Sequence, residues 1–201
     1  MPRPPNPEVR QRLIEAGMSL ISARGFGSSG VKDITDAAGV PKGSFYNYFS
    51  SKESFAIAML DADWAGVQDH ADVAFANTSL DPIARVASFF HAMAQDHASH
   101  AFVRGCLIGN LSLELSGESL PVRHKLVELL QRWESILAEA LLEAQTAGQI
   151  AADQDVHDLA ATLIEAWEGA VLRGKVEQRR DSYRRFETSV LPKILGQTAL
   201  V

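Results

Sequence analysis

The chain of 201 residues contains one cysteine, no long apolar run and no apolar segment near its N-terminus. A lone Cys106 excludes a disulfide within the chain and is typical of a protein from a reducing compartment. The opening residues, MPRPPNPEVRQ, lack the apolar core of a secretory signal, and no stretch of about 18 apolar residues could form a membrane span. We therefore expect a cytosolic globular protein that buries its own core.

Strand patterns are also missing, because no stretch alternates β-branched with polar residues between hairpin turns. Apolar residues instead recur at helical spacing, and several helix ends are marked. Asn6 followed by Pro7 is typical of a helix start, and Gly25 of a helix end. Ser50 to Glu53 reads as a capping box, and Pro192 predicts a kink in the last helix. We predict an all-α fold of about nine helices, over residues 7–24, 31–38, 41–49, 50–76, 82–98, 105–116, 119–147, 153–177 and 183–195.

Charge is distributed unevenly along the chain, whose net charge is −6. Residues 1–52 hold seven Lys or Arg, including Arg3, against four Asp or Glu, which is +3 and leaves −9 for the remainder. A basic segment on an acidic body is expected where only one end of a protein approaches phosphates. We predict a boundary after residue 52, with a helix-turn-helix domain over 1–52 and a second domain over 53–201.

The most informative stretch is VKDITDAAGVPKGSFYNYFSSKESF, residues 31–55. Two short helices separated by Gly39 form a helix-turn-helix layout. Phe45 and Phe49 would anchor one face of the second helix, and its polar face suits a major groove. Lys52 would meet a phosphate at the start of the next helix. A plain corner between two helices without DNA binding would have the same layout, with the aromatic pair in the core.

The longer segment GFGSSGVKDITDAAGVPKGSFYNYFSSKESF resembles the DNA-binding domain of TetR-family transcriptional repressors. This resemblance implies a homodimer that places two recognition helices in a palindromic double-stranded operator, and a second domain for ligand sensing and dimerisation. It places phosphate contacts at Ser29, Thr35, Lys42, Tyr48 and Lys52, and base contacts at Lys42, Gly43, Ser44, Tyr46 and Asn47. The sequence departs from the family pattern at Gly30, where Ser or Thr is frequent, and in YNY, where YHH is frequent.

Residues 53–201 offer an interface and a pocket. A stripe of small residues, Ala166, Ala170 and Gly174, would let two helices approach closely, and we interpret it as the dimer interface, although a contact within the chain would use the same residues. Large side chains on expected inward faces are candidates for a ligand pocket or for ordinary core. These are Trp64, Phe89, Phe90, His91, Phe102, Leu113, Trp133 and Trp167.

Cys106 lies in RGCLIGN, at the expected start of a helix, where free N–H groups and Arg104 would favour a thiolate. Asn110, one turn further on, could bind a ligand or the thiol. The alternative is a small buried residue without chemistry. RGCLIGNLSLELS and EGAVLRGKVEQ resemble the TetR branch of the N-ethylmaleimide-resistance and acrylate-responsive repressors. That resemblance implies sensing of electrophiles, oxidants or small unsaturated acids, with Lys175 near the thiol.

Other chemistry has little support in the sequence. His97 and His100 lie three residues apart beside Asp96, but no second cluster of ligands accompanies them, so we expect no metal site. Cys106 with either histidine is the only suggested nucleophile and base, and no cofactor motif is present. We therefore expect no enzyme and no cofactor. The leading hypothesis is a repressor released by a small inducer, and the alternative is a DNA-binding protein that senses no ligand.

Overall fold

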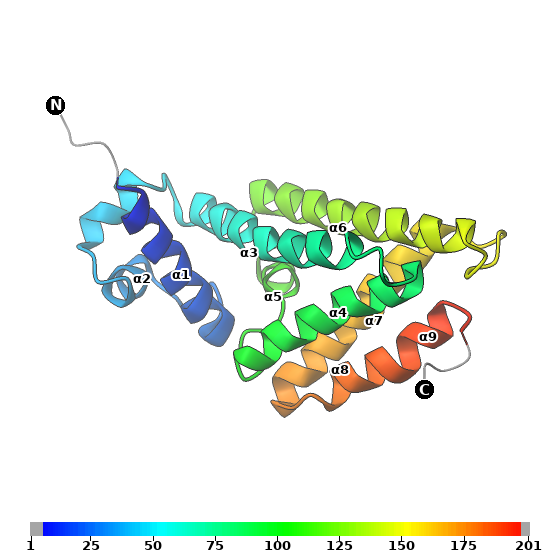
Figure 1. The fold of residues 1–201 in the computed structure, drawn as a ribbon. Coiled ribbons are helices and arrows are strands. Elements are labelled where there is room, and N and C mark those ends of the chain that lie inside the picture. Colours follow the sequence, from blue (N-terminus) through cyan, green and yellow to red (C-terminus); the bar gives the residue numbers. More distant parts are fainter. Residues whose placement is uncertain (1–5, 198–201) are drawn as a thin grey trace. The chain divides into compact units, whose positions relative to one another are not determined.

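The computed structural model describes residues 6–197, and the remaining residues, which include Arg3 and the outer ends of both predicted domains, lie outside that range. Within it the chain is all-helical, with no strand, as the sequence predicts. Figure 1 traces the helices in chain order. They are α1 Pro7–Arg24, α2 Val31–Ala37, the 3-10 helix η1 Lys42–Asn47, α3 Lys52–Phe75, α4 Pro82–Ser99, α5 Leu107–Leu115, α6 Leu120–Thr146, α7 Val156–Glu177, α8 Asp181–Arg185, the π-helix η2 Phe186–Val190 and α9 Leu191–Ile194.

The chain divides into two compact units, neither of which is continuous in sequence. The first comprises Met1–Ala65 and Leu107–Val127, and the second comprises Gly66–Cys106 and Glu128–Val201. Helices α3 and α6 each contribute residues to both units. A domain boundary at residue 52 stays a prediction. No helix in the described range is long and apolar enough to cross a membrane.

The first unit is built on α1, whose ends form as the sequence predicts. The Asn6 side chain accepts a hydrogen bond from the Glu8 amide at 3.0 Å, and Gly25 ends the helix with a φ of 86°. α3 crosses α1 closely at Gly17, because a Cβ there would lie 2.3 Å from the Phe55 ring. This close contact holds the start of α3 against α1.

The cap at the start of α3 differs by one residue from the prediction. The Ser54 amide donates to the Ser51 hydroxyl at 3.1 Å, and the Ser51 amide donates to the Ser54 hydroxyl at 3.0 Å. The reciprocal pair of a capping box is therefore Ser51 with Ser54, and the prediction of Ser50 with Glu53 is wrong. A serine serves at the second position because its hydroxyl both donates and accepts.

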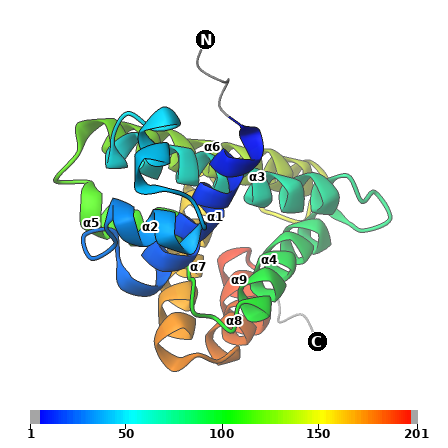
Figure 2. The same cartoon turned by 90° about the vertical axis from the view of Figure 1, so that its left-hand side faces the viewer.

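The second unit contains α4, α7 and the segment from α8 to α9, which lie side by side in Figures 1 and 2. Aromatic rings fill the space between them. The Phe90 and Phe186 ring centroids are 4.9 Å apart, and Trp167 lies 5.3 Å from Phe186 and 5.4 Å from Tyr183. All four side chains are buried. The four rings come from α4, α7, α8 and η2, so their contacts hold these helices against one another.

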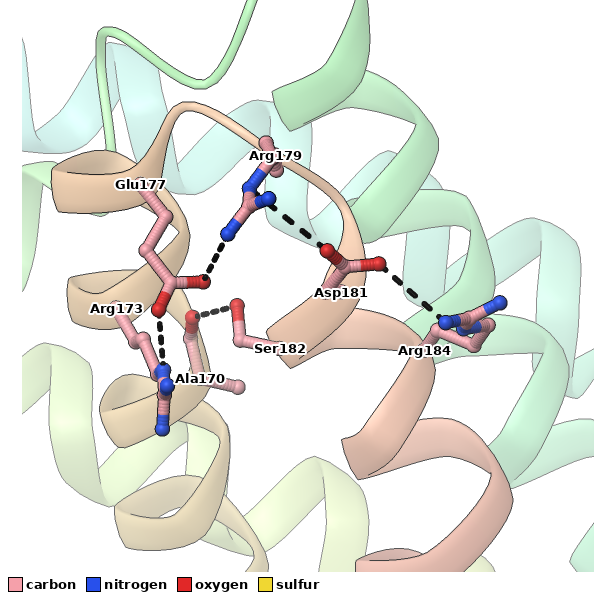
Figure 3. Close-up of polar contacts among 7 residues, drawn as sticks. All are labelled: Ala170, Arg173, Glu177, Arg179, Asp181, Ser182 and Arg184. Carbon is pink, nitrogen blue, oxygen red and sulfur yellow. Dashed lines mark hydrogen bonds and ion pairs between the residues drawn. The ribbon is translucent and has the colours of Figure 1, made fainter.

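The α7–α8 turn carries the polar contacts of Figure 3. Arg173 and Glu177 are paired at 2.7 Å on α7, and Arg184 pairs with Asp181 at 3.3 Å on α8. The four arginines of this region, two acidic residues and two hydroxyl residues line an open hollow of about 390 Å³: Arg173, Glu177, Arg179, Asp181, Arg184, Arg185, Thr188 and Ser189.

Two residues of the small-residue stripe of α7 have contacts within the chain. The Ser182 hydroxyl donates to the Ala170 carbonyl at 2.7 Å (Figure 3), and the Tyr183 ring lies where a Cβ of Gly174 would be, 2.2 Å from its Cε2 atom. Reading Gly174 as a dimer contact is therefore wrong, because α8 already covers it, while the half-buried Ala166 and Ala170 stay predicted contacts. The exposed side of α7 instead presents Leu172 and Val176.

The last helical segment is irregular where Pro192 predicts a kink. The π-helix η2 directly precedes α9, in which Pro192 occupies the first turn. The Leu191 amide bonds the Phe186 carbonyl, five residues back. A proline cannot donate to the preceding turn and its ring crowds the carbonyl four residues back, which favours a wider turn here.

Candidate nucleic-acid interface and thiol site

The helix-turn-helix polar face is presented by η1, the second helix of the motif, which forms a 3-10 helix. Phe45 and Phe49 anchor its other face as predicted, with ring centroids 5.2 Å and 4.8 Å from that of Phe55. Outward lie Lys42, Gly43, Tyr46 and Asn47, which are exposed, and Ser44, which is half-buried. Although η1 is short, the packing of Phe45 and Phe49 on Phe55 holds it in place, so that its outward side chains can contact DNA.

Two predicted phosphate contacts point inward. The Ser29 hydroxyl donates to the Gly25 carbonyl at 2.8 Å, and the Thr35 hydroxyl donates to the Val31 carbonyl at 3.0 Å. Both side chains are buried, so in this structure neither hydroxyl is available to a phosphate. Both instead support the start of α2. A hydroxyl at these positions suits a bond to a nearby carbonyl as well as a phosphate contact, which is why the sequence did not separate the two roles.

Tyr48 and Lys52 frame the same surface. The Tyr48 hydroxyl accepts a hydrogen bond from the Asn6 amide at 2.9 Å, which ties the end of η1 to the start of α1. The Lys52 ammonium donates to the Phe26 carbonyl and lies 4.0 Å from the centroid of the Phe26 ring. Burial lowers the pKa of Lys52 from its ordinary value. Both residues are half-buried and hold the motif together as well as lying at its edge.

The thiol lies where the sequence places it, because Cys106 immediately precedes α5. The chain that leads to it has an unusual backbone. Ala101 and Phe102 both have positive φ angles, 51° and 60°, and Gly105 follows at 64°. Left-handed conformations at residues other than glycine cost of order 1 kcal/mol each and persist where the surroundings hold them. Here the Phe102 amide bonds the His97 carbonyl at 2.9 Å.

A buried carboxyl faces the thiol. The Cys106 side chain is hydrogen-bonded to Glu168 of α7, whose pKa is raised by burial and lowered in part by this bond. The other oxygen, Oε1, is buried without a hydrogen-bond partner. The sequence predicts basic surroundings from Arg104 and Lys175, and the structure adds an acid. Glu168 was missed although it lies on the buried side of α7, four residues after Ile164 and three before Val171.

Lys175 reaches the same segment. Its ammonium donates to the Arg104 carbonyl at 3.3 Å, two residues before the cysteine. The structure therefore brings Lys175 to the chain that carries Cys106, as the resemblance implies. Asn110 belongs to α5 in the first unit and is half-buried. Its role as a ligand contact stays a prediction.

His97 joins this region through Tyr183. Its Nδ1 atom and the Tyr183 hydroxyl are 2.8 Å apart, and burial lowers the pKa of His97 to about 4. Burial, together with the charges of Glu168 and Cys106, raises the pKa of Tyr183. Both groups are therefore neutral at physiological pH. With a pKa of about 4, His97 is a weak base for the thiol, whereas Glu168 is hydrogen-bonded to Cys106.

Some of the predicted pocket residues are buried in the core and others lie on the surface. Phe90, Trp133 and Trp167 are buried, and the indole nitrogens of both tryptophans lack hydrogen-bond partners. Two candidates do not lie on an inward face as predicted, and a sensing role for His91 stays a prediction. His91 is exposed and its Nδ1 lies 3.1 Å from the Glu187 carboxylate, and Leu113 is 85% exposed. His91 follows two buried phenylalanines, so the helical rotation of about 100° per residue takes it to the surface.

Metal binding finds no support in the described range, where no three His, Cys, Asp or Glu side chains are gathered as ligands. His100 bonds the Asp96 carbonyl at 3.0 Å, while His97 points to Tyr183. The two histidines that are close in sequence therefore have separate partners. The structure gives each of them a local hydrogen-bonding role.

Two family models match the sequence. Residues 13–59 match the bacterial regulatory proteins of the tetR family, and residues 82–190 match the tetracyclin repressor-like C-terminal domain. The first match covers the helix-turn-helix and its supports. The second covers residues 101–106, which we call the thiol segment because it ends at Cys106, and the aromatic cluster of the second unit.

Three relatives are similar over most of the chain. The transcriptional regulator AcuR of Cereibacter sphaeroides is 40% identical, covering 89% of this chain and 81% of its own. The repressor DhaR of Mycobacterium sp. strain GP1 is 38% identical, covering 94% of both chains. The crystal structure of the reduced form of NemR from Escherichia coli is 26% identical with a TM-score of 0.80, covering 94% of this chain and 99% of that one. The predicted similarity to the N-ethylmaleimide-resistance branch is confirmed.

Proposed function

The chain belongs to the TetR family of bacterial transcriptional regulators, and we propose that it is a cytoplasmic repressor whose operator binding is relieved by a small reactive inducer. The observation that carries the DNA-binding half is the exposed polar face of η1, anchored on buried Phe45 and Phe49. Lys42, Tyr46 and Asn47 on that face offer charge and hydrogen bonds to a major groove. The sensing half rests on the position of Cys106 directly before α5 and on the Lys175 ammonium at the Arg104 carbonyl, with the Glu168 carboxyl beside the thiol.

A pair of recognition helices would be needed to read a palindrome, and the family acts through dimers on operator DNA. We place the dimer face on the exposed side of α7, where Leu172 is 61% and Val176 78% exposed. Large apolar side chains this exposed on neighbouring turns of one helix favour burial by a second subunit. Sedimentation of Leu172→Glu with Val176→Glu tests the assignment. We expect the double variant to shift toward monomer, and an unchanged dimer would place the interface elsewhere.

The proposed DNA-reading surface of η1 is tested by Lys42→Ala, with Lys193→Ala as a matched control. Both lysines are exposed, but Lys193 lies on α9, far along the chain from the motif. Binding is measured on a duplex that the wild-type protein selects from a random library. We expect Lys42→Ala to bind more weakly by about 1–3 kcal/mol and the control to bind as wild type. Equal affinity of all three proteins would contradict the recognition surface.

The inducer would be an electrophile, an oxidant or a small unsaturated acid that reacts or binds beside Cys106. For an activated double bond, the sulfur forms a bond to one carbon, the π electrons move to the neighbouring carbon, and the thiol proton is finally taken up there. Glu168 lies where it can accept that proton in passing, because it is already hydrogen-bonded to the thiol. The product must favour the form of the dimer that binds DNA less well, since only differential binding shifts a population.

Cys106→Ser tests the sensing half. Because the chain has one cysteine, a mass increase that the wild-type protein shows and Cys106→Ser does not show assigns the adduct to the thiol. We expect N-ethylmaleimide to add once to the wild-type protein and to weaken operator binding, and to do neither with Cys106→Ser. If the serine variant loses operator binding in response to electrophiles, oxidants and acrylate just as the wild type does, the thiol is not the trigger. If no compound changes binding by the wild type, the protein senses no inducer of these classes.

A further inference from the structure

A carboxylate from α5 holds the turn between α1 and α2. The Gly27 amide donates to Oε2 of Glu114 at 3.1 Å, although 87 residues separate them in sequence. Both residues belong to the first unit, so this contact lies inside one compact body. Gly25 has a φ of 86°, and a Cβ there would lie 3.1 Å from the same carboxylate. The turn therefore fits closely around Glu114.

The same carboxylate faces a partly buried cation. Lys52 donates to the carbonyl of Phe26, inside this turn, and its ammonium lies over the Phe26 ring. Burial lowers the pKa of Lys52, and the negative charge of Glu114 acts in the opposite direction. Glu114 thus accepts a hydrogen bond from the Gly27 amide of the turn. Its negative charge also stabilises Lys52, whose ammonium donates to the Phe26 carbonyl of the same turn.

What the turn controls is the start of α2. Ser29 in the turn donates through its hydroxyl to Gly25, and its amide bonds the Phe26 carbonyl at 3.3 Å. Gly30 follows as the N-cap of α2, where the Asp33 carboxylate accepts from its amide at 2.8 Å. Because α2 packs against η1, the direction in which the turn releases the chain sets the position of the DNA-reading helix.

We propose that Glu114 is a positioning residue for operator recognition, acting on the DNA-reading surface through the α1–α2 turn without touching DNA. The proposal rests on the proposed operator binding and adds a residue of the acidic body to it. Helix α5 is continuous from Leu107, the residue after Cys106, to Leu115, so Glu114 lies two turns along the helix that the thiol segment begins.

The test compares Glu114→Ala and Glu114→Gln with the control Glu118→Ala, an exposed glutamate just beyond α5. Affinity is measured for the selected operator duplex and for a scrambled duplex. Loss of a hydrogen bond to a charged group predicts roughly tenfold weaker operator binding by Glu114→Ala. Binding to the scrambled duplex stays within about twofold, because phosphate contacts supply non-specific affinity. Glu114→Gln, which keeps an acceptor for the Gly27 amide, is expected to lie between wild type and Glu114→Ala.

Amide exchange supplies a direct readout of the contact. We expect the Gly27 amide to exchange faster in Glu114→Ala, while the variant still unfolds in urea in one cooperative transition. Operator affinity within twofold of wild type for Glu114→Ala would overturn the proposal, as would an equal loss on both duplexes. If the wild-type protein itself selects no duplex, the proposed function fails instead, so the two failures are distinguishable.

Discussion

His97 makes the stability of the protein depend on pH in a direction that can be worked out. Burial holds its pKa at about 4, against 6.5 for an ordinary histidine. Below pH 6.5 His97 binds a proton in the unfolded chain but not in the folded chain. The contribution of His97 to the free energy of unfolding is therefore fully present above pH 6.5 and is lost as the pH falls toward 4. Each unit is worth about 1.36 kcal/mol, which gives a loss of roughly 3 kcal/mol over that window and about 2 kcal/mol at pH 5.

The charges around His97 set the size of this shift. The Asp96 carboxylate raises its pKa, and His100 and His70 lower it, but burial is the largest cause. Its Nδ1 atom already has a partner in the Tyr183 hydroxyl, which is itself buried. Burial disfavours the charged imidazolium, which is the physical reason for the low pKa of His97.

The measurement is a series of urea unfolding curves between pH 7 and pH 4.5 for wild type, His97→Gln and the control His124→Gln, an exposed histidine on α6. Protomer concentration is held constant, because association contributes to stability. We expect the free energy of unfolding of His97→Gln to fall less than that of wild type, by about 2 kcal/mol at pH 5. The control should follow wild type. If His97→Gln also runs parallel to wild type, His97 titrates as in the unfolded chain and the reasoning is refuted.

Three further predictions concern α7 and the DNA-reading helix η1. Gly174→Ala should destabilise the protein by about 1–3 kcal/mol in urea unfolding, because the new Cβ would lie 2.2 Å from the Tyr183 ring. Glu168→Gln should stabilise the protein at pH 7. Burial raises the pKa of Glu168, so the contribution of Glu168 to the free energy of unfolding is greatest below its ordinary pKa of 4.5 and falls as the pH rises. Lys42→Ala should reduce the slope of log affinity against log salt by about 0.9 if that ammonium meets one phosphate.

Each of these predictions has an outcome that contradicts it. Gly169→Ala is the control for Gly174→Ala, since nothing lies within 4 Å of its would-be Cβ. Equal stability of the two alanine variants would mean that the Tyr183 ring moves aside freely. A less stable Glu168→Gln at pH 7 would mean that the bond to Cys106 outweighs the cost of burying the carboxylate. An unchanged salt slope for Lys42→Ala would remove that residue from the phosphate contacts.

Local chemistry made much of the fold predictable. The Asn6 cap, the Gly25 stop and the anchoring of Phe45 and Phe49 all depend on residues close in sequence, and each is found in the structure. Errors of one residue came where neighbours are chemically alike, as at Ser50 and Ser51. His91 shows the other kind of error, because the side of a helix that faces inward depends on where the other helices lie.

The sequence by itself determined the helices, the DNA-reading motif and the place of the thiol at the start of a helix, because caps, spacing and motifs are local. Only the tertiary structure decided what the thiol meets. Glu168 is separated from Cys106 by 62 positions in the numbering, and Glu114 from Gly27 by 87, so neither pair leaves a pattern in the chain. It also packed Gly174 of α7 against the Tyr183 ring of the same chain. Burial, which raises the pKa of Glu168 and lowers that of His97, exists only once the distant helices have packed.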